Sequence, residues 1–119
     1  MKKKCLSLIL ALYLCVGLAF PVMAEGNLGK AGQTNTVCAG SGISAVIDQN
    51  GSLWICGDNW CGQLGNGVQG GKNAVNFVKV MDNVVSVSCS GRFVAAIKSD
   101  GSLWMWGDNS HGELGNGGK

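Results

Sequence analysis

Cysteine and histidine are the residues of this 119-residue chain best suited to metal binding or covalent chemistry. Four of the six cysteines follow residue 24, and these are Cys38, Cys56, Cys61 and Cys89. The spacing of Cys56 and Cys61 permits either a local disulfide or part of a zinc site that includes His111. Fifty residues later, where the sequence repeats, both cysteines are replaced together, which favours a disulfide between them. We expect no metal ion. Cys61 and His111 hold matching positions in two successive copies of this repeat, and such positions lie too far apart to share one ion.

Cys38 and Cys89 are each predicted to lie on the first strand of a repeat unit. They are 51 residues apart, one more than the period of the repeat, so their side chains point to opposite faces of the two sheets. Residues of opposite phase on adjacent units face each other, so a bridge between them is conceivable. Packed sheets, however, lie ~10 Å apart, whereas a disulfide needs Cα atoms within ~7 Å. The sequence therefore predicts two small buried thiols at these positions.

No set of side chains suited to catalysis is evident. His111 is the only histidine, and a nucleophile, a base and an orienting group cannot be assembled around it. The Gly-Asn-Gly runs lack the lysine and the hydroxyl residue of a phosphate-binding loop. Asp58 and Asp108 precede asparagines in glycine-rich loops, where such residues commonly bond to turn backbone. We expect no enzyme activity, no cofactor and an exposed His111.

The four tryptophans divide into two kinds. Trp54 and Trp104 hold matching strand positions and are expected in the core. Trp106 aligns with Cys56, so the repeat does not require an aromatic residue there. Trp60 lies in a loop and is the candidate binding residue, because aromatic side chains anchor protein interfaces. Partial burial of its ring against the neighbouring blade is the alternative.

The first 24 residues have the three parts of a secretory signal peptide. The basic stretch Lys2–Lys4 precedes the apolar run Cys5–Phe20, and Val22-Met23-Ala24 provides small residues before a cleavage point at Glu25. We expect a signal-peptide helix that is removed, followed by a flexible segment over residues 25–35. Retention as an N-terminal anchor is the alternative. After cleavage no membrane span is expected, and the predicted location is outside the cell or on its surface.

The charge of the chain argues against a nucleic-acid partner. Three of the nine basic residues lie in the leader, which leaves six basic and seven acidic residues and a net charge of −1. Nucleic-acid binders cluster their basic residues, whereas these six are scattered singly. Twenty glycines with four tryptophans favour tight turns around packed strands over helices or disorder.

A repeat with a period of fifty residues organises the rest of the chain. Residues 51–67 and 101–117 are identical at 12 of 17 positions without a gap. The shared residues expected to have structural roles are Gly51, Leu53, Trp54, Gly57, Gly62, Leu64, Gly65 and Gly67 in the first copy, and Gly101, Leu103, Trp104, Gly107, Gly112, Leu114, Gly115 and Gly117 in the second. Asn50-Gly51 and Asp100-Gly101 indicate hairpins closed by two-residue type I′ turns.

Strand-like segments flank these turns. The expected strands span residues 36–39, 43–48, 52–57 and 75–80 in the first unit and 84–89, 93–98 and 102–107 in the second. Apolar or small residues on both faces of the second unit indicate a sheet packed between two others. Four short antiparallel strands per unit are typical of a propeller blade. We predict an all-β fold with blade one over residues 36–80 and an incomplete blade two over 84–117, within a repeat region that extends to residue 119.

The repeat resembles that of the regulator of chromosome condensation family. The resemblance rests on Val87-Ser88-Cys89, on Ala96-Ile97, on Asp100 to Asn109 and on the Gly-x-Leu-Gly-Asn-Gly run that begins at Gly112. It covers nearly all of residues 36–117 and implies a seven-bladed propeller. Two blades leave two apolar faces uncovered, and repeat arrays need about three units. We expect either a truncated gene product or self-assembly of several copies into a ring.

Three functions are open on this sequence. The leading hypothesis is a secreted or cell-surface scaffold that binds a protein partner of unknown identity through its loops. A secreted inhibitor of an enzyme, like the propellers that inhibit β-lactamases, is the alternative. The resemblance also implies guanine nucleotide exchange or chromatin binding, but the leader and the net charge of −1 disfavour both.

Overall fold

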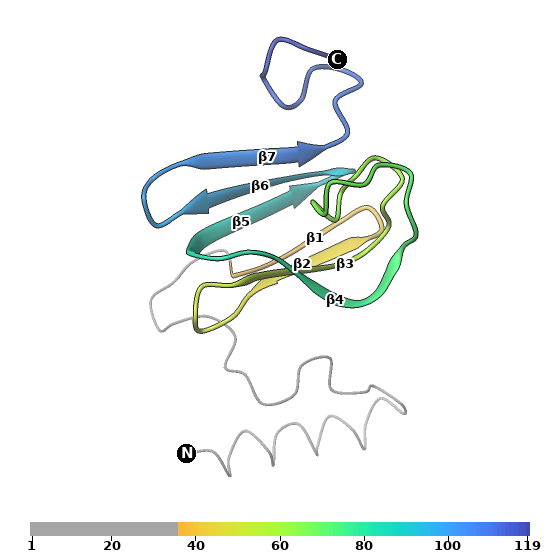
Figure 1. Ribbon diagram of the computed structural model, residues 1–119. Helices are drawn as coiled ribbons and strands as arrows, with labels where there is room; N and C mark the ends of the chain where they lie inside the picture. Colours follow the sequence, from red (N-terminus) through yellow and green to blue (C-terminus); the bar gives the residue numbers. More distant parts are fainter. Residues whose placement is uncertain (1–35) are drawn as a thin grey trace.

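The computed structural model describes residues 36–119, which form two antiparallel sheets joined by loops (Figure 1). The first sheet has the order β1-β2-β3-β4, with β1 at Val37–Gly40, β2 at Ile43–Ile47, β3 at Leu53–Gly57 and β4 at Ala74–Met81. The second has the order β5-β6-β7, with β5 at Val84–Ser90, β6 at Phe93–Lys98 and β7 at Leu103–Gly107. Every expected strand is present, with its ends within one residue of the expected ones.

The predicted signal peptide and the predicted flexible segment over residues 25–35 lie outside the described residues. Within residues 36–119, the structure contains no helix with the length and apolar character needed to cross a membrane.

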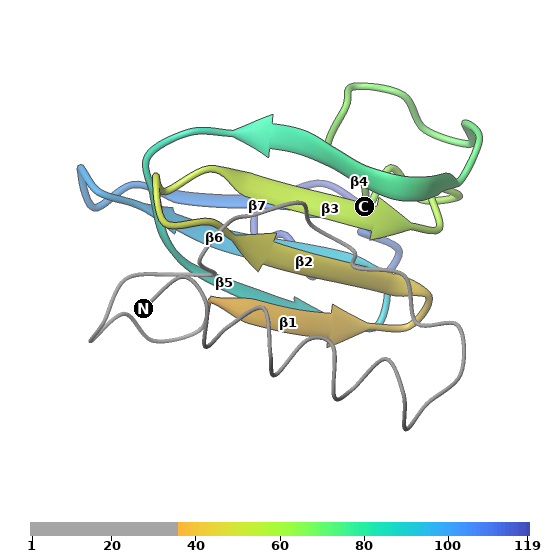
Figure 2. The same ribbon diagram turned by 90° about the horizontal axis from the view of Figure 1, so that it is seen from below.

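The two sheets stack face to face, and the core lies between them (Figures 1 and 2). Strand alternation sends one set of side chains from each sheet into this layer. The buried core side chains are Ile43, Ala45, Ile47, Leu53, Ile55 and Leu64 from the first blade and Val84, Val87, Val94 and Ala96 from the second. Each blade therefore depends on its neighbour for burial, as expected of a repeat architecture.

The innermost strands, β1 and β5, come unusually close. The Ser41 amide donates to the Gly91 carbonyl oxygen at 2.8 Å, which joins the tips of the two inner hairpins. A Cβ added at Gly40 would lie 2.9 Å from that same oxygen, so a glycine is needed there. Further along, the Val84 amide donates to the Gly51 carbonyl at 2.8 Å and links blade one to the start of β5.

Both predicted hairpins form, but the type I′ prediction is wrong. The Asp48 amide donates to the Ser52 carbonyl at 2.9 Å, and the Gly51 amide donates to the Asp48 carbonyl at 3.0 Å, which leaves a three-residue loop. Gly51 has a positive φ of 80°, whereas Asn50 does not have a positive φ. This is a turn followed by a left-handed glycine, a common three-residue hairpin. The Asp48 side chain stabilises it by accepting the Asn50 and Ser52 amides, at 2.8 and 3.0 Å.

Equivalent positions in the two blades differ sharply in exposure. Leu53 is completely buried, whereas its counterpart Leu103 is 62% exposed. Ile47 is likewise buried, whereas Ile97 is 42% exposed. Blade two packs against one face of blade one. No other segment within residues 36–119 covers the face of blade two that points away from blade one.

Candidate functional site

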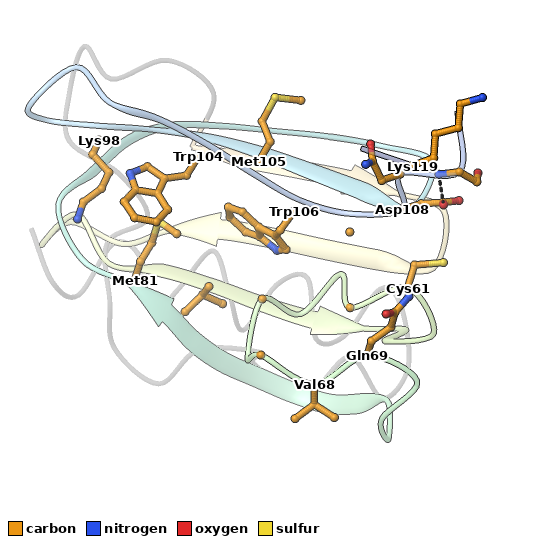
Figure 3. Close-up of a pocket in the computed structure, with 17 residues that line it drawn as sticks. Cys61, Val68, Gln69, Met81, Lys98, Trp104, Met105, Trp106, Asp108 and Lys119 are labelled. Atoms are coloured by element: carbon orange, nitrogen blue, oxygen red, sulfur yellow. Dashed lines mark hydrogen bonds between the residues drawn. The ribbon is translucent and has the colours of Figure 1, made fainter. Parts of the chain in front are cut away.

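A groove with a volume of about 870 Å³ lies between the two blades (Figure 3). Trp104 and Trp106 of β7 form one wall, and Val80 and Met81 of β4 form the other. The glycine-rich loop that follows β3 closes one end. The rings of Trp104 and Trp106 point toward β4, whereas the side chain of Met105 points away from it (Figure 3).

The tryptophans are not placed as the sequence suggested. Trp104 is 51% exposed, so the expectation that it lies in the core is wrong. Its ring lines the groove, with the Lys98 ammonium 5.7 Å from the ring centre, close enough for a cation–π contact. Trp106 instead packs against the core, and its Nε1 donates to the Gln63 carbonyl of blade one at 2.9 Å. Trp54 is half-buried and donates through Nε1 to Oδ2 of Asp48 at 2.9 Å.

The cysteine pairing also differs from the expected one. Cys38 and Cys89 form a disulfide between β1 and β5, with Cα atoms 5.7 Å apart, whereas Cys56 and Cys61 are free. The predicted Cys56–Cys61 bridge and the predicted buried thiols at Cys38 and Cys89 are therefore wrong. The ~10 Å spacing of stacked sheets is a mean value, and the inner strands converge well below it. Partial burial raises the pKa of the Cys56 thiol.

Trp60 stands on a loop that is held rigidly from within. It is 70% exposed, whereas the neighbouring Asn59 and Gln63 are fully buried. The Asn59 side chain accepts the Leu64 amide at 3.1 Å and donates to the Val68 carbonyl at 2.9 Å. Gln63 accepts the Cys61 amide at 2.8 Å. The loop thus presents an exposed aromatic ring on an ordered backbone.

His111 has a polar cluster around it but no catalytic arrangement. Its side chain is 86% exposed, as expected, and its Nδ1 lies 3.0 Å from Ser110 Oγ and 3.3 Å from Glu113 Oε1. Glu113, two residues further along the chain, is thus a carboxylate partner of His111, although the first repeat has Gln63 at this position. A hydroxyl–imidazole–carboxylate relay needs the hydroxyl and the carboxylate on different ring nitrogens. Here both contact Nδ1, so the cluster cannot relay a proton from serine to carboxylate.

Residues 36–119 contain no group of three or more histidine, cysteine, aspartate or glutamate side chains positioned to hold a metal ion. Asp58 and Asp108 serve their loops as expected. Their Oδ1 atoms accept the amides of Trp60 and Ser110, at 3.2 and 3.0 Å.

The residues shared by the two repeats shape the loops around the groove. Gly57 and Gly107 end β3 and β7 with φ of 116° and 109°, and a Cβ at either would collide with the carbonyl oxygen of Gly42 or Arg92. The other shared glycines with positive φ are Gly51, Gly62, Gly65 and Gly67 in blade one and Gly101, Gly112, Gly115 and Gly117 in blade two. Leu64 is buried beneath its loop, and Leu114 is half-buried.

Asp48 has the most extensive hydrogen bonding of the carboxylates. Partial burial raises its pKa, but the hydrogen bonds from Trp54, Ser52 and Asn50 together outweigh this effect and lower the pKa below its usual value. In blade two Lys98 takes the place of Asp48, and Asp100 accepts the Ser102 amide instead, at 2.9 Å.

Comparison with known proteins agrees with this geometry. Residues 84–113, which span β5 to the loop after β7, match the regulator of chromosome condensation (RCC1) repeat. Residues 84–113 thus form a repeat of the RCC1 type. Its fold is similar to that of yeast Prp20 in a complex with Kap60, with a TM-score of 0.67 and 19% identity, over 86% of this chain and 24% of that one.

Two further structures share the fold. A structure of Prp20p from Saccharomyces cerevisiae, described together with its binding to Gsp1p and histones, matches with a TM-score of 0.66, 22% identity, 86% of this chain and 25% of that one. Human WBSCR16 matches with a TM-score of 0.60, 24% identity, 73% of this chain and 21% of that one. The chain thus spans about a fifth to a quarter of the length of these neighbours. A comparison with curated proteins finds no match.

Proposed function

We propose that this chain is a β-propeller repeat scaffold that acts outside the cell or on its surface and binds a protein partner through the loop that carries Trp60. The 70% exposure of Trp60 on a loop fixed by buried Asn59 and Gln63 is the observation that carries the proposal. A rigid, exposed aromatic side chain loses little conformational freedom when it is buried by a partner, which makes it an effective anchor.

Chemistry and charge support binding over the other hypotheses. The cluster around His111 lacks the geometry for nucleophilic catalysis, and Cys38–Cys89 is a disulfide, which persists in oxidising compartments outside the cytosol. Prp20p is described as binding Gsp1p and histones. For this chain, a predicted export leader and a net charge of −1 after it favour an extracellular partner over a nuclear one.

The location is tested by fractionating cells that express the full chain and sequencing the N-terminus of the exported form. We expect an extracellular or surface protein that begins at Glu25. A cytosolic protein that retains Met1 would contradict the proposed location.

The binding role is tested by cross-linking the exported protein to surface and secreted proteins and comparing three forms: wild type, Trp60→Ala and Val75→Ala. Val75 is 92% exposed and serves as the matched apolar control. We expect Trp60→Ala to lower the yield of a specific partner at least ten-fold and Val75→Ala to leave it unchanged. Equal yields from all three forms would contradict a role for Trp60. Inhibition of a captured hydrolase by the wild-type protein would narrow the function to that of an inhibitor.

A further inference from the structure

Blade one contains the dipeptide Asn-Gly twice, and this dipeptide has a chemistry of its own. The main-chain nitrogen after an asparagine can attack the asparagine side chain, and a glycine at that position has no Cβ to shield the nitrogen. Asparagine is accordingly among the thermolabile residues that heat-stable proteins avoid. The two copies are Asn50-Gly51 in the hairpin turn and Asn66-Gly67 in the glycine-rich loop. Both asparagines are exposed, so exposure does not distinguish the two sites.

The Asn66 side chain is folded toward the reacting nitrogen. Its Oδ1 accepts the Val68 amide at 3.0 Å, an Asx turn that brings the side-chain amide back over the Asn66–Gly67 peptide bond. The Val68 N–H is thus bonded to the oxygen on which negative charge develops when Cγ is attacked, as in an oxyanion hole.

The Gly67 nitrogen is also unobstructed. Within residues 36–119, no hydrogen bond engages the Gly67 amide. A Cβ added at Gly67 would have no atom within 4 Å, so there is room for a ring to close and for water to reach it. The loop therefore leaves the nucleophile available and supplies a donor to the oxygen of the group that it attacks.

Asn50-Gly51 has the opposite geometry. The Gly51 amide donates to the Asp48 carbonyl oxygen at 3.0 Å, so this nitrogen is engaged in the turn. The Gly51 carbonyl accepts the Val84 amide at 2.8 Å, which ties the same turn to the start of β5. In the described part of the chain, no amide donates to the Asn50 side-chain oxygen. Attack at Asn50 would break the turn without a donor to stabilise the charge that develops.

We propose that Asn66 is a self-modification site, at which the folded loop converts asparagine to aspartate and isoaspartate while Asn50 stays unmodified. The Gly67 nitrogen forms a bond to Cγ of Asn66, and the side-chain nitrogen leaves as ammonia with the proton that the Gly67 nitrogen gives up. Water then adds to one carbonyl carbon of the resulting succinimide and breaks the bond from that carbon to the ring nitrogen, which takes back a proton. Opening at Cγ gives aspartate, and opening at the main-chain carbonyl carbon gives isoaspartate. Water is the only other reactant.

The modification reaches the loop that carries Trp60. Isoaspartate lengthens the main chain by one carbon, two residues before Val68. The Val68 carbonyl accepts Nδ2 of Asn59 at 2.9 Å, and Asn59 is one of the buried side chains that hold the loop. A displaced Val68 therefore loosens Asn59 and the loop around it. An effect on partner binding rests on the proposed function, whereas the chemistry at Asn66 does not.

The test compares the two dipeptides in the same sample. The exported protein is incubated in mildly alkaline buffer, digested and mapped by mass spectrometry, with isoaspartate detected by enzymatic methylation. A parallel sample is incubated in concentrated urea, where both dipeptides are unfolded. In the folded protein we expect conversion at Asn66 to be at least ten-fold faster than at Asn50. In urea the two rates should agree within about two-fold, because the same dipeptide then lacks a fixed structure.

Three variants test the geometry. Asn66→Gln should remove the product at this loop, and Asn50→Gln is the matched control that should leave the yield at Asn66 unchanged. Val68→Pro removes the amide that donates to Oδ1 and should slow conversion at Asn66 several-fold in the folded protein. If this variant does not fold, the wild-type comparison of folded and urea-treated samples decides by itself.

Equal rates at Asn66 and Asn50 in the folded protein, a faster rate at Asn50, or conversion at Asn66 only in urea would overturn the proposal. Hydrogen exchange tests the consequence for the loop. The Leu64 amide donates to Asn59 Oδ1 at 3.1 Å, so it should exchange at least five-fold faster in the isoaspartate form, and an unchanged rate would refute the link to the Trp60 loop. Failure of the proposed function would show in cross-linking of Trp60→Ala and leave the peptide map as it is, so the two failures are distinguishable.

Discussion

The Cys38–Cys89 disulfide should supply a large share of the stability of the two-blade unit. It closes a loop with a sequence separation of 51 residues between β1 and β5. In the chain-entropy treatment, a cross-link of this span lowers the entropy of the unfolded chain by about 14 cal/mol/K, which stabilises the native state by about 4 kcal/mol at 25 °C. Domains of this size have a total stability of about 5–10 kcal/mol, so the loss would be severe.

The assay is urea denaturation of the exported protein, followed by tryptophan fluorescence. With a denaturant dependence of about 2 kcal/mol/M, replacement of both Cys38 and Cys89 by serine should lower the midpoint by about 2 M. Reduction of the wild-type protein should lower it by a similar amount. The matched control replaces the free Cys56 and Cys61 by serine and should retain the full response to reductant. A shift below about 0.5 M, or four free thiols in the exported protein, would refute the reasoning.

Three further predictions concern single residues. Leu53→Ala should lower the free energy of unfolding by about 2–5 kcal/mol, and Leu103→Ala by under about 1 kcal/mol, because only Leu53 is buried; urea unfolding tests both. Gly57→Ala should lower the thermal midpoint far more than Gly67→Ala, because only at Gly57 would the Cβ meet neighbouring atoms. Asp48→Asn should lower stability by about 1 kcal/mol at pH 7. Because the folded pKa of Asp48 is depressed, its contribution is full above the unfolded pKa of about 3.9 and is lost as the pH falls through the folded value. In urea titrations the difference between the wild type and Asp48→Asn should therefore shrink as the pH is lowered from 7 into the acid range.

Local sequence was sufficient to predict the strands and their order. Short apolar runs and glycine-rich turns are short-range signals, and the fifty-residue repeat supplied two copies of each. The same signals failed for the turn type, because the carboxylate of Asp48 stabilises a three-residue loop that the Asn50-Gly51 pair alone does not reveal. A signal was present in the spacing of Asp48 and Ser52, which allows one side chain to accept two amides.

Burial could not be predicted from the repeat. Trp104 and Leu103 have the same sequence environment as Trp54 and Leu53, but they lie on faces or edges that no other part of residues 36–119 covers. Trp106, which the repeat does not require, makes one of the contacts between the blades through its bond to the Gln63 carbonyl. The burial of each residue depends on whether another blade packs against its face of the sheet, and the type of the residue does not reveal this.

The sequence by itself determined the all-β repeat, the strand ends and the residues shared by the two copies, because these depend on backbone preference and on contacts within one blade. The tertiary structure decided the cysteine pairing and the role of each tryptophan. The physical reason is distance: the inner strands converge until two Cα atoms lie 5.7 Å apart, and only the packing of two complete sheets sets that separation.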